Sequence, residues 1–111
     1  MKIRFTAVLA PAVVAAALTA SPAFAADSAA GKTLYDSKCK TCHLADGSGN
    51  PGMGKALGVT IKPLGGADVQ GMSDADLKKV VTAGSGKMKP VAGVAGGDLD
   101  NVVAYVRTLK K

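Results

Sequence analysis

The chain has 111 residues, of which 48% are hydrophobic and 4% aromatic, and its formal net charge is +6. All of its acidic residues are aspartates, and most of its basic residues are lysines. A basic surface suits an acidic protein, an anionic membrane or a nucleic acid. The scarcity of aromatic side chains for base stacking argues against nucleic acid, so we expect an acidic protein partner.

Residues 1–25 are typical of a cleaved secretory signal peptide. Lys2 and Arg4 form a basic start, an alanine-rich apolar run containing one proline follows, and Ala-Phe-Ala ends the segment as a signal peptidase requires. The competing interpretation is a transmembrane helix, which needs about 20 unbroken apolar residues. The apolar run here is shorter and is interrupted by Pro11. We therefore expect a periplasmic protein without stable membrane insertion, consisting of one small domain over residues 26–111.

The first predicted helix runs from about Ser28 into "CKTCH", residues 39–43. Gly31, Tyr35 and Cys39 recur along it near helical spacing. The next stretch, "LADGSGNPGMGKALG", is rich in glycine, proline, serine and asparagine, which predicts a long loop without regular structure.

Two more helices are predicted in the second half of the chain. In "SDADLKKVVTAG", Ser73 is the expected N-cap and Gly84 the expected left-handed terminus. After a glycine-rich loop, "DLDNVVAYVRTLKK" has Asp98 as the expected cap and an apolar stripe at helical spacing. No stretch alternates apolar and polar residues for long enough to form a sheet, so the sequence predicts an all-α fold.

Cys39 and Cys42 are the only cysteines, and His43 is the only histidine. A dithiol redox site would need a strand–helix thioredoxin pattern, which is missing. A zinc site would need four ligands, and only three nitrogen or sulfur ligands are available. A disulfide across so short a loop would add little stability. The C-x-x-C-H pattern is instead typical of covalent haem attachment.

The spacing of these three residues has a physical reason. Residues i, i+3 and i+4 project from nearly the same face of a helix. Cys39 and Cys42 can therefore each bond one edge position of the porphyrin, while His43 reaches the iron. A domain this small usually recruits such a group to complete its core.

Three segments in this order resemble the class I cytochromes c: "AGKTLYDSKCKTCH", "MSDADLKKVVTAGSGKM" and "VVAYVRTL". The resemblance covers all of residues 26–111 and implies three to four short helices and glycine-rich loops around one covalently attached haem c. It also implies that Gly31 lets the first and last helices cross closely. Tyr35 would then pack against the last helix at Val102, Tyr105 and Val106.

The resemblance implies a methionine as the second axial iron ligand. Met88 follows the middle helix in a polar, glycine-rich loop, as the ligand of the family does. Met53 is the runner-up, and Met72 lies next to the helix cap, where packing is expected. The family commonly has proline directly after this methionine, whereas here Lys89 intervenes before the proline.

A further carry-over from the family concerns the orientation of His43. A ligating histidine usually donates its other N–H to a fixed acceptor. In the family this acceptor is a proline carbonyl in the loop after the motif, and Pro51 resembles it. The alternative role of Pro51 is to stiffen the loop.

The implied function is electron transfer by a monomeric periplasmic carrier that is not an enzyme and that works between redox protein partners. The lysines expected near the haem edge would either steer an acidic partner or form a solvated surface; they are Lys38, Lys40, Lys55, Lys87 and Lys89. One alternative is a haem protein with a vacant or labile sixth site that binds gas or acts as a weak peroxidase. Another is a non-redox module held by a disulfide.

Overall fold

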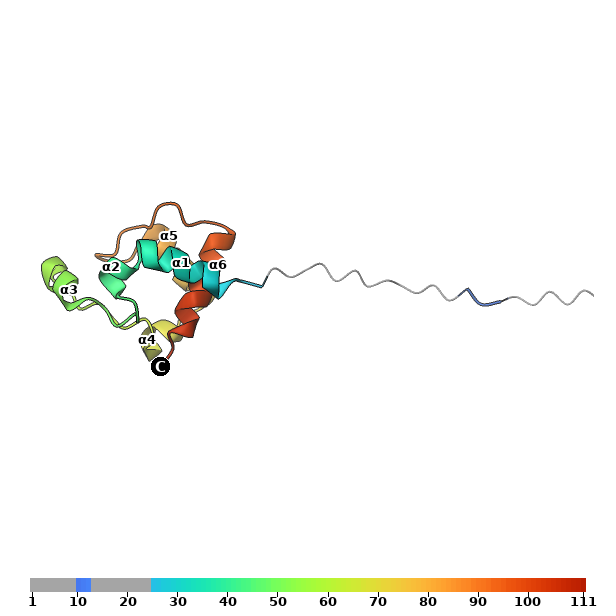
Figure 1. Ribbon diagram of the computed structural model, residues 1–111, viewed down its shortest axis with the longest axis horizontal. Coiled ribbons are helices and arrows are strands. Elements are labelled where there is room, and N and C mark those ends of the chain that lie inside the picture. Colours follow the sequence, from blue (N-terminus) through green and yellow to red (C-terminus); the bar gives the residue numbers. More distant parts are fainter. Residues whose placement is uncertain (1–9, 13–24) are drawn as a thin grey trace, which may run out of the picture.

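The structure is a computed structural model that describes residues 10–12 and 25–111. Most of the expected signal peptide, residues 1–9 and 13–24, lies outside the described residues, so that assignment stays a prediction. The described part of the chain forms six helices and no strand (Figure 1): α1 Ser28–Lys38, α2 Lys40–His43, α3 Pro51–Leu57, α4 Ala67–Gln70, α5 Asp74–Ala83 and α6 Gly97–Thr108. The predicted all-α fold is confirmed. None of these described helices is both long and apolar enough to cross a bilayer.

Helices α1 and α6 lie side by side (Figure 1). They cross at Gly31. A Cβ atom on Gly31 would overlap the carbonyl oxygen of Asn101 and lie 3.1 Å from Cβ of Tyr105. One turn later, the fully buried ring of Tyr35 lies 5.0 Å from that of Tyr105, tilted by 60°. Val102, on the same stretch of α6, is only 2% exposed. The predicted close crossing is confirmed.

Side chains and glycines determine where the longer helices begin. Ser73 caps α5 as predicted, because its Oγ accepts the Asp76 N–H at 3.1 Å. The predicted cap of α6 is wrong: Asp98 lies inside the first turn, and the N-cap is Gly96, with φ of 57°. The Asp98 carboxylate still lies near the positive end of the α6 dipole.

The prediction of a long irregular loop over residues 44–58 is also wrong, because this stretch contains α3. The Asn50 side chain accepts the N–H groups of Gly52 at 3.0 Å and Met53 at 3.3 Å, and Pro51 occupies the first turn. Gly58 ends the helix in the left-handed conformation, with φ of 70°. Together with the short α2 and α4, this helix raises the count above the expected three to four.

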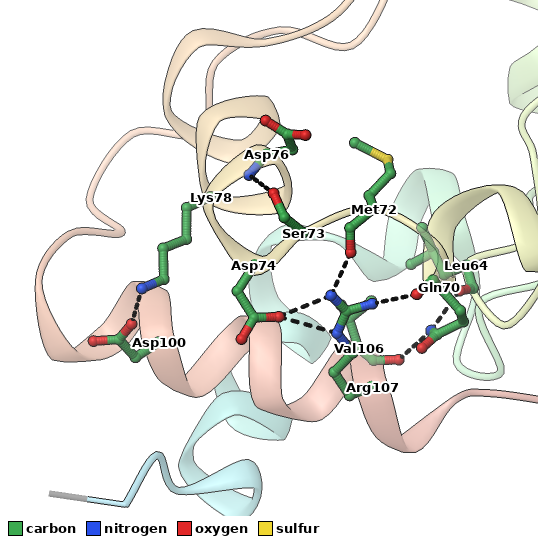
Figure 2. A network of polar contacts seen from close by, with 10 residues as sticks. All are labelled: Leu64, Gln70, Met72, Ser73, Asp74, Asp76, Lys78, Asp100, Val106 and Arg107. Carbon is green, nitrogen blue, oxygen red and sulfur yellow. Dashed lines mark hydrogen bonds and ion pairs between the residues drawn. The ribbon is translucent and has the colours of Figure 1, made fainter. Parts of the chain in front are cut away.

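Arg107 of α6 binds the segment that joins α4 to α5 (Figure 2). Its guanidinium donates to the carbonyl oxygens of Gln70 at 2.9 Å and Met72 at 2.6 Å, and to Oδ1 of Asp74 at 2.8 Å. The Gln70 amide in turn donates to the carbonyl oxygen of Val106 at 3.0 Å. This network attaches α4 and the start of α5 to α6, and so fixes one wall of the site described next.

Candidate functional site

A cavity of about 1020 Å³ lies between the helices. Its volume is at the upper end of the range for small-molecule and cofactor sites, about 300–1,000 Å³. The wall contains Cys39, Cys42 and His43 together with many apolar residues, among them Leu64, Leu77, Val80, Val102 and Val106. The cavity is therefore large and mostly apolar, with both thiols and the imidazole concentrated at one place.

The junction of α1 and α2 places the two thiols and the imidazole on one helical turn. The Cys39 N–H donates to the Tyr35 carbonyl at 2.9 Å, which ends α1. The N–H groups of Cys42 and His43 then donate to the Cys39 carbonyl at 3.3 and 3.0 Å. Both cysteines are half-buried free thiols, and burial raises the pKa of the Cys39 thiol. The structure thus brings together the three residues that the sequence motif singled out.

The chain reverses direction immediately after His43. Leu44 has φ of 65° and ψ of 167°, and it is the only non-glycine residue with positive φ among the described residues. Such a conformation costs about 1–3 kcal/mol and persists only where its surroundings enforce it. The Leu44 N–H donates to the Lys40 carbonyl at 2.8 Å, and its own carbonyl accepts the Tyr35 hydroxyl at 2.5 Å. The buried tyrosine therefore holds the turn that follows the histidine.

Burial lowers the pKa of His43 because the charged imidazolium loses its hydration. A neutral imidazole is the form that binds a metal ion. Nδ1 of His43 is buried and has no hydrogen-bond partner among the residues that the structure describes. The predicted bond to the Pro51 carbonyl is therefore wrong for this structure, in which Pro51 is the exposed first residue of α3. A buried nitrogen without a partner fits a histidine that serves a bound group.

All three methionines of the described chain line the same cavity, and all are half-buried: Met53 from α3, Met72 before α5, and Met88 from the loop between α5 and α6. Met72 was expected only to pack against α5, and sequence reasoning missed its position at the cavity. Two thiols, an imidazole and thioether side chains around an apolar space of this size fit a covalently attached haem.

The charged residues of the cavity wall all have the same sign. They are Lys38, Lys62, Lys87 and Lys89, and no aspartate of the described chain joins them. Of the five lysines expected near a haem edge, Lys40 and Lys55 are exposed but do not line the cavity, and Lys62 was missed. Lys62 could have been found only from the path of the chain after α3.

Comparisons with known proteins agree with this chemistry. The family model described as "Cytochrome C oxidase, cbb3-type, subunit III" matches residues 26–106. Cytochrome c-554(547) of Halothiobacillus neapolitanus is 41% identical over 91 residues, covering 78% of this chain and 100% of that protein. Cytochrome c6 of Rippkaea orientalis is 35% identical over 95 residues, covering 82% of this chain and 78% of that protein.

The solved structure of the KustC0563 c-type cytochrome is similar to this fold, with a TM-score of 0.61 and 30% sequence identity. The similarity covers 73% of this chain and 98% of that chain. The chain therefore belongs to the family that the matching model describes, as a small class I cytochrome c that binds haem c covalently and carries electrons between redox partners.

Proposed function

We propose that the protein is a monomeric periplasmic electron carrier whose haem is attached through Cys39 and Cys42 and ligated by His43 and Met88. When bound, the haem supplies a one-electron ferric–ferrous couple. The observation that carries the proposal is that one apolar cavity is lined by both thiols, the imidazole and the Met88 side chain.

Each of these residues has a distinct role. Cys39 and Cys42, one helical turn apart, would hold the porphyrin edge covalently, so that a small domain could not lose it. His43 presents a neutral ring nitrogen, because burial lowers its pKa. Met88 would supply a thioether ligand to the iron, which would raise the reduction potential relative to a second histidine. The similarity to cytochromes c-554(547) and c6 supports a carrier and not an enzyme.

The surroundings of the site support electron exchange with a protein partner. The apolar walls exclude water, which limits the rearrangement of solvent around a changing charge. The lysines Lys38, Lys62, Lys87 and Lys89 at the cavity give it positive charge without an opposing aspartate. Such a surface steers an acidic redox protein toward the site.

Residues 1–25 belong to the same proposal as a signal peptide that is removed on export, leaving a domain over residues 26–111. The mass of the protein recovered from a periplasmic extract checks this. A mass that retains residues 1–25 would contradict the assignment.

A second candidate function is a gas binder or weak peroxidase with a labile sixth site. It differs from the first only in the sixth iron ligand, which none of the three methionines at the cavity is singled out to supply by position alone. Absorption spectra of the purified holoprotein separate the two functions. For an electron carrier we expect the red charge-transfer absorption of a methionine-ligated ferric haem and a ferrous form that does not bind carbon monoxide.

The same spectra of Met88→Ala, with Met53→Ala and Met72→Ala as matched controls, identify the ligand. We expect only Met88→Ala to lose the charge-transfer absorption. If Met53→Ala loses the charge-transfer absorption instead, Met53 is the iron ligand. Rapid binding of carbon monoxide by the wild-type ferrous protein would favour the second function.

A further inference from the structure

The backbone around Met88 forms a closed hairpin at the cavity. The Ser85 N–H donates to the Met88 carbonyl at 2.9 Å, and the Met88 N–H donates to the Ser85 carbonyl at 2.9 Å. Gly86 and Lys87 form the two-residue turn between them, and Gly86 has φ of 55°. Two-residue turns of this kind require a positive φ at the first central position, which glycine adopts without strain. Met88 is therefore the closing residue of a hydrogen-bonded turn.

Gly84 attaches this hairpin to the end of α5. Its φ of 76° and ψ of 175° lie in a region that is essentially restricted to glycine. A Cβ atom at this position would lie 2.6 Å from the Met88 carbonyl oxygen and 2.9 Å from Cδ of Pro90. The chain leaving the hairpin is also fixed, because the Val91 N–H donates to the Val81 carbonyl of α5 at 2.8 Å.

The contact between Gly84 and Pro90 depends on Lys89, the residue that stands between Met88 and the proline. With Lys89 inserted, the proline that follows Met88 packs against Gly84 and not directly beside the methionine. The hairpin is thus held at both of its ends, by Gly84 at the end of α5 and by the bond from the Val91 N–H to the Val81 carbonyl.

We propose that Gly84 is a positioning residue that seats the hairpin on α5, so that Met88 is held at the cavity by the backbone and not by its bond to iron alone. This inference rests on the proposed function, in which Met88 is the sixth ligand. It deepens that function, because a ligand held by the backbone resists displacement, whereas the alternative function needs a labile sixth site. A side chain at residue 84 must push the Met88 carbonyl away and loosen the ligand.

Titration of the ferric holoprotein with imidazole tests the proposal, because imidazole competes with the sixth ligand. Gly93→Ala is the matched control: Gly93 also has a positive φ, of 79°, but its Cβ would meet only the Lys38 side chain, at 3.7 Å. We expect Gly84→Ala to bind imidazole at least about tenfold more tightly than wild type, a change of about 1.4 kcal/mol. Gly93→Ala should bind it as wild type does.

Amide hydrogen exchange supplies a second readout that does not depend on ligand competition. The Ser85 and Met88 amides, which bond to each other's carbonyls, should exchange faster in Gly84→Ala and unchanged in Gly93→Ala. If Gly84→Ala does not assemble, Gly86→Ala perturbs the same hairpin more gently, because its Cβ would meet no atom within 4 Å. We expect this variant to shift imidazole affinity and amide exchange in the same direction.

Two results would overturn the inference. One is an equal shift of imidazole affinity and amide exchange in Gly84→Ala and Gly93→Ala, and the other is wild-type behaviour of both Gly84→Ala and Gly86→Ala. Failure of the proposed function gives a different result. If Met88→Ala keeps the charge-transfer absorption, Met88 is not the ligand and both proposals fall. If Met88→Ala loses it while the Gly84 and Gly86 variants behave as wild type, only the positioning role falls.

Discussion

Gly31→Ala is the substitution whose effect can be worked out most directly from the structure. Its Cβ would overlap the Asn101 carbonyl oxygen, lie 2.5 Å from the carbonyl carbon, and lie 3.1 Å from Cβ of Tyr105. The first two atoms belong to the backbone of α6, so no side-chain rotation can make room. Helices α1 and α6 must move apart, which also weakens the contact between Tyr35 and Tyr105.

The magnitude follows from three contributions. Overpacking of this kind costs about 1–3 kcal/mol, and a backbone clash belongs at the upper end. Disturbing an aromatic pair costs about 1 kcal/mol more, while the better helix propensity of alanine returns about 1 kcal/mol. We expect Gly31→Ala to lower the free energy of unfolding by about 3 kcal/mol. For a domain of this size, that lowers Tm by about 12–24 °C.

Thermal unfolding of the holoprotein, followed by circular dichroism at 222 nm, measures this loss. Gly97→Ala is the matched control, because Gly97 also lies in a helix and a Cβ there would meet no atom within 4 Å. We expect its Tm to equal or slightly exceed that of the wild type. A Gly31→Ala variant that unfolds at the same temperature as Gly97→Ala would refute the reasoning that the two helices cross at a glycine.

Three further predictions concern Arg107, Tyr35 and the lysines of the cavity. Arg107→Lys should lower the free energy of unfolding in denaturant by about 2 kcal/mol. The single nitrogen of an ammonium cannot take the place of the planar guanidinium, which donates to two carbonyls and a carboxylate. Tyr35→Phe should cost about 1 kcal/mol, because the Leu44 carbonyl loses its hydroxyl donor. Burial raises the pKa of Tyr35, so Tyr35 ionises at a lower pH in the unfolded chain than in the folded protein. Above about pH 10 the wild type therefore loses stability that Tyr35→Phe keeps, and the difference in unfolding free energy between the two proteins should narrow. The double variant Lys87→Glu/Lys89→Glu should slow oxidation of the reduced protein by ferricyanide about tenfold at low ionic strength, and should speed oxidation by a cationic cobalt complex.

Each of these predictions has a control of matched chemistry. Lys78→Ala removes an exposed ion pair with an aspartate of α6 and should lower the free energy of unfolding by less than about 1 kcal/mol. If Arg107→Lys lowers it by no more than this, the Arg107 network contributes no more than an exposed ion pair. Tyr105→Phe, the same change on the neighbouring ring, should cost less than about 0.5 kcal/mol. The double variant Lys79→Glu/Lys110→Glu changes exposed lysines away from the cavity. If it slows ferricyanide as much, the effect reflects net charge and not a localised surface.

The features that sequence predicted correctly depend on short-range geometry. One turn of a helix fixes how residues 39, 42 and 43 project, so the motif alone predicted that Cys39, Cys42 and His43 lie together. The cap at Ser73 depends on a bond across three residues. The close crossing at Gly31 is a long-range feature, and it was expected only through the resemblance to a known family.

The features that sequence missed depend on contacts between distant segments or on weak local signals. Arg107 donates a hydrogen bond to Gln70, 37 positions away, and no local pattern in either segment predicts this contact. For α3, the local signals were present at Asn50, Pro51 and Gly58, but the glycine content of the stretch outweighed them. The orientation of His43 was predicted from family likeness, but Nδ1 of His43 has no hydrogen-bond partner among the described residues.

The two candidate axial ligands each lie near a residue with a positive φ. His43 precedes Leu44, whose positive φ is held by the buried Tyr35 hydroxyl. Met88 closes a hairpin that follows Gly84, whose positive φ is needed to seat that hairpin on α5. Each candidate ligand thus lies beside a backbone turn that its surroundings enforce. If both bind the iron as proposed, they would need little rearrangement when the charge at the site changes, which would favour rapid electron exchange over ligand replacement.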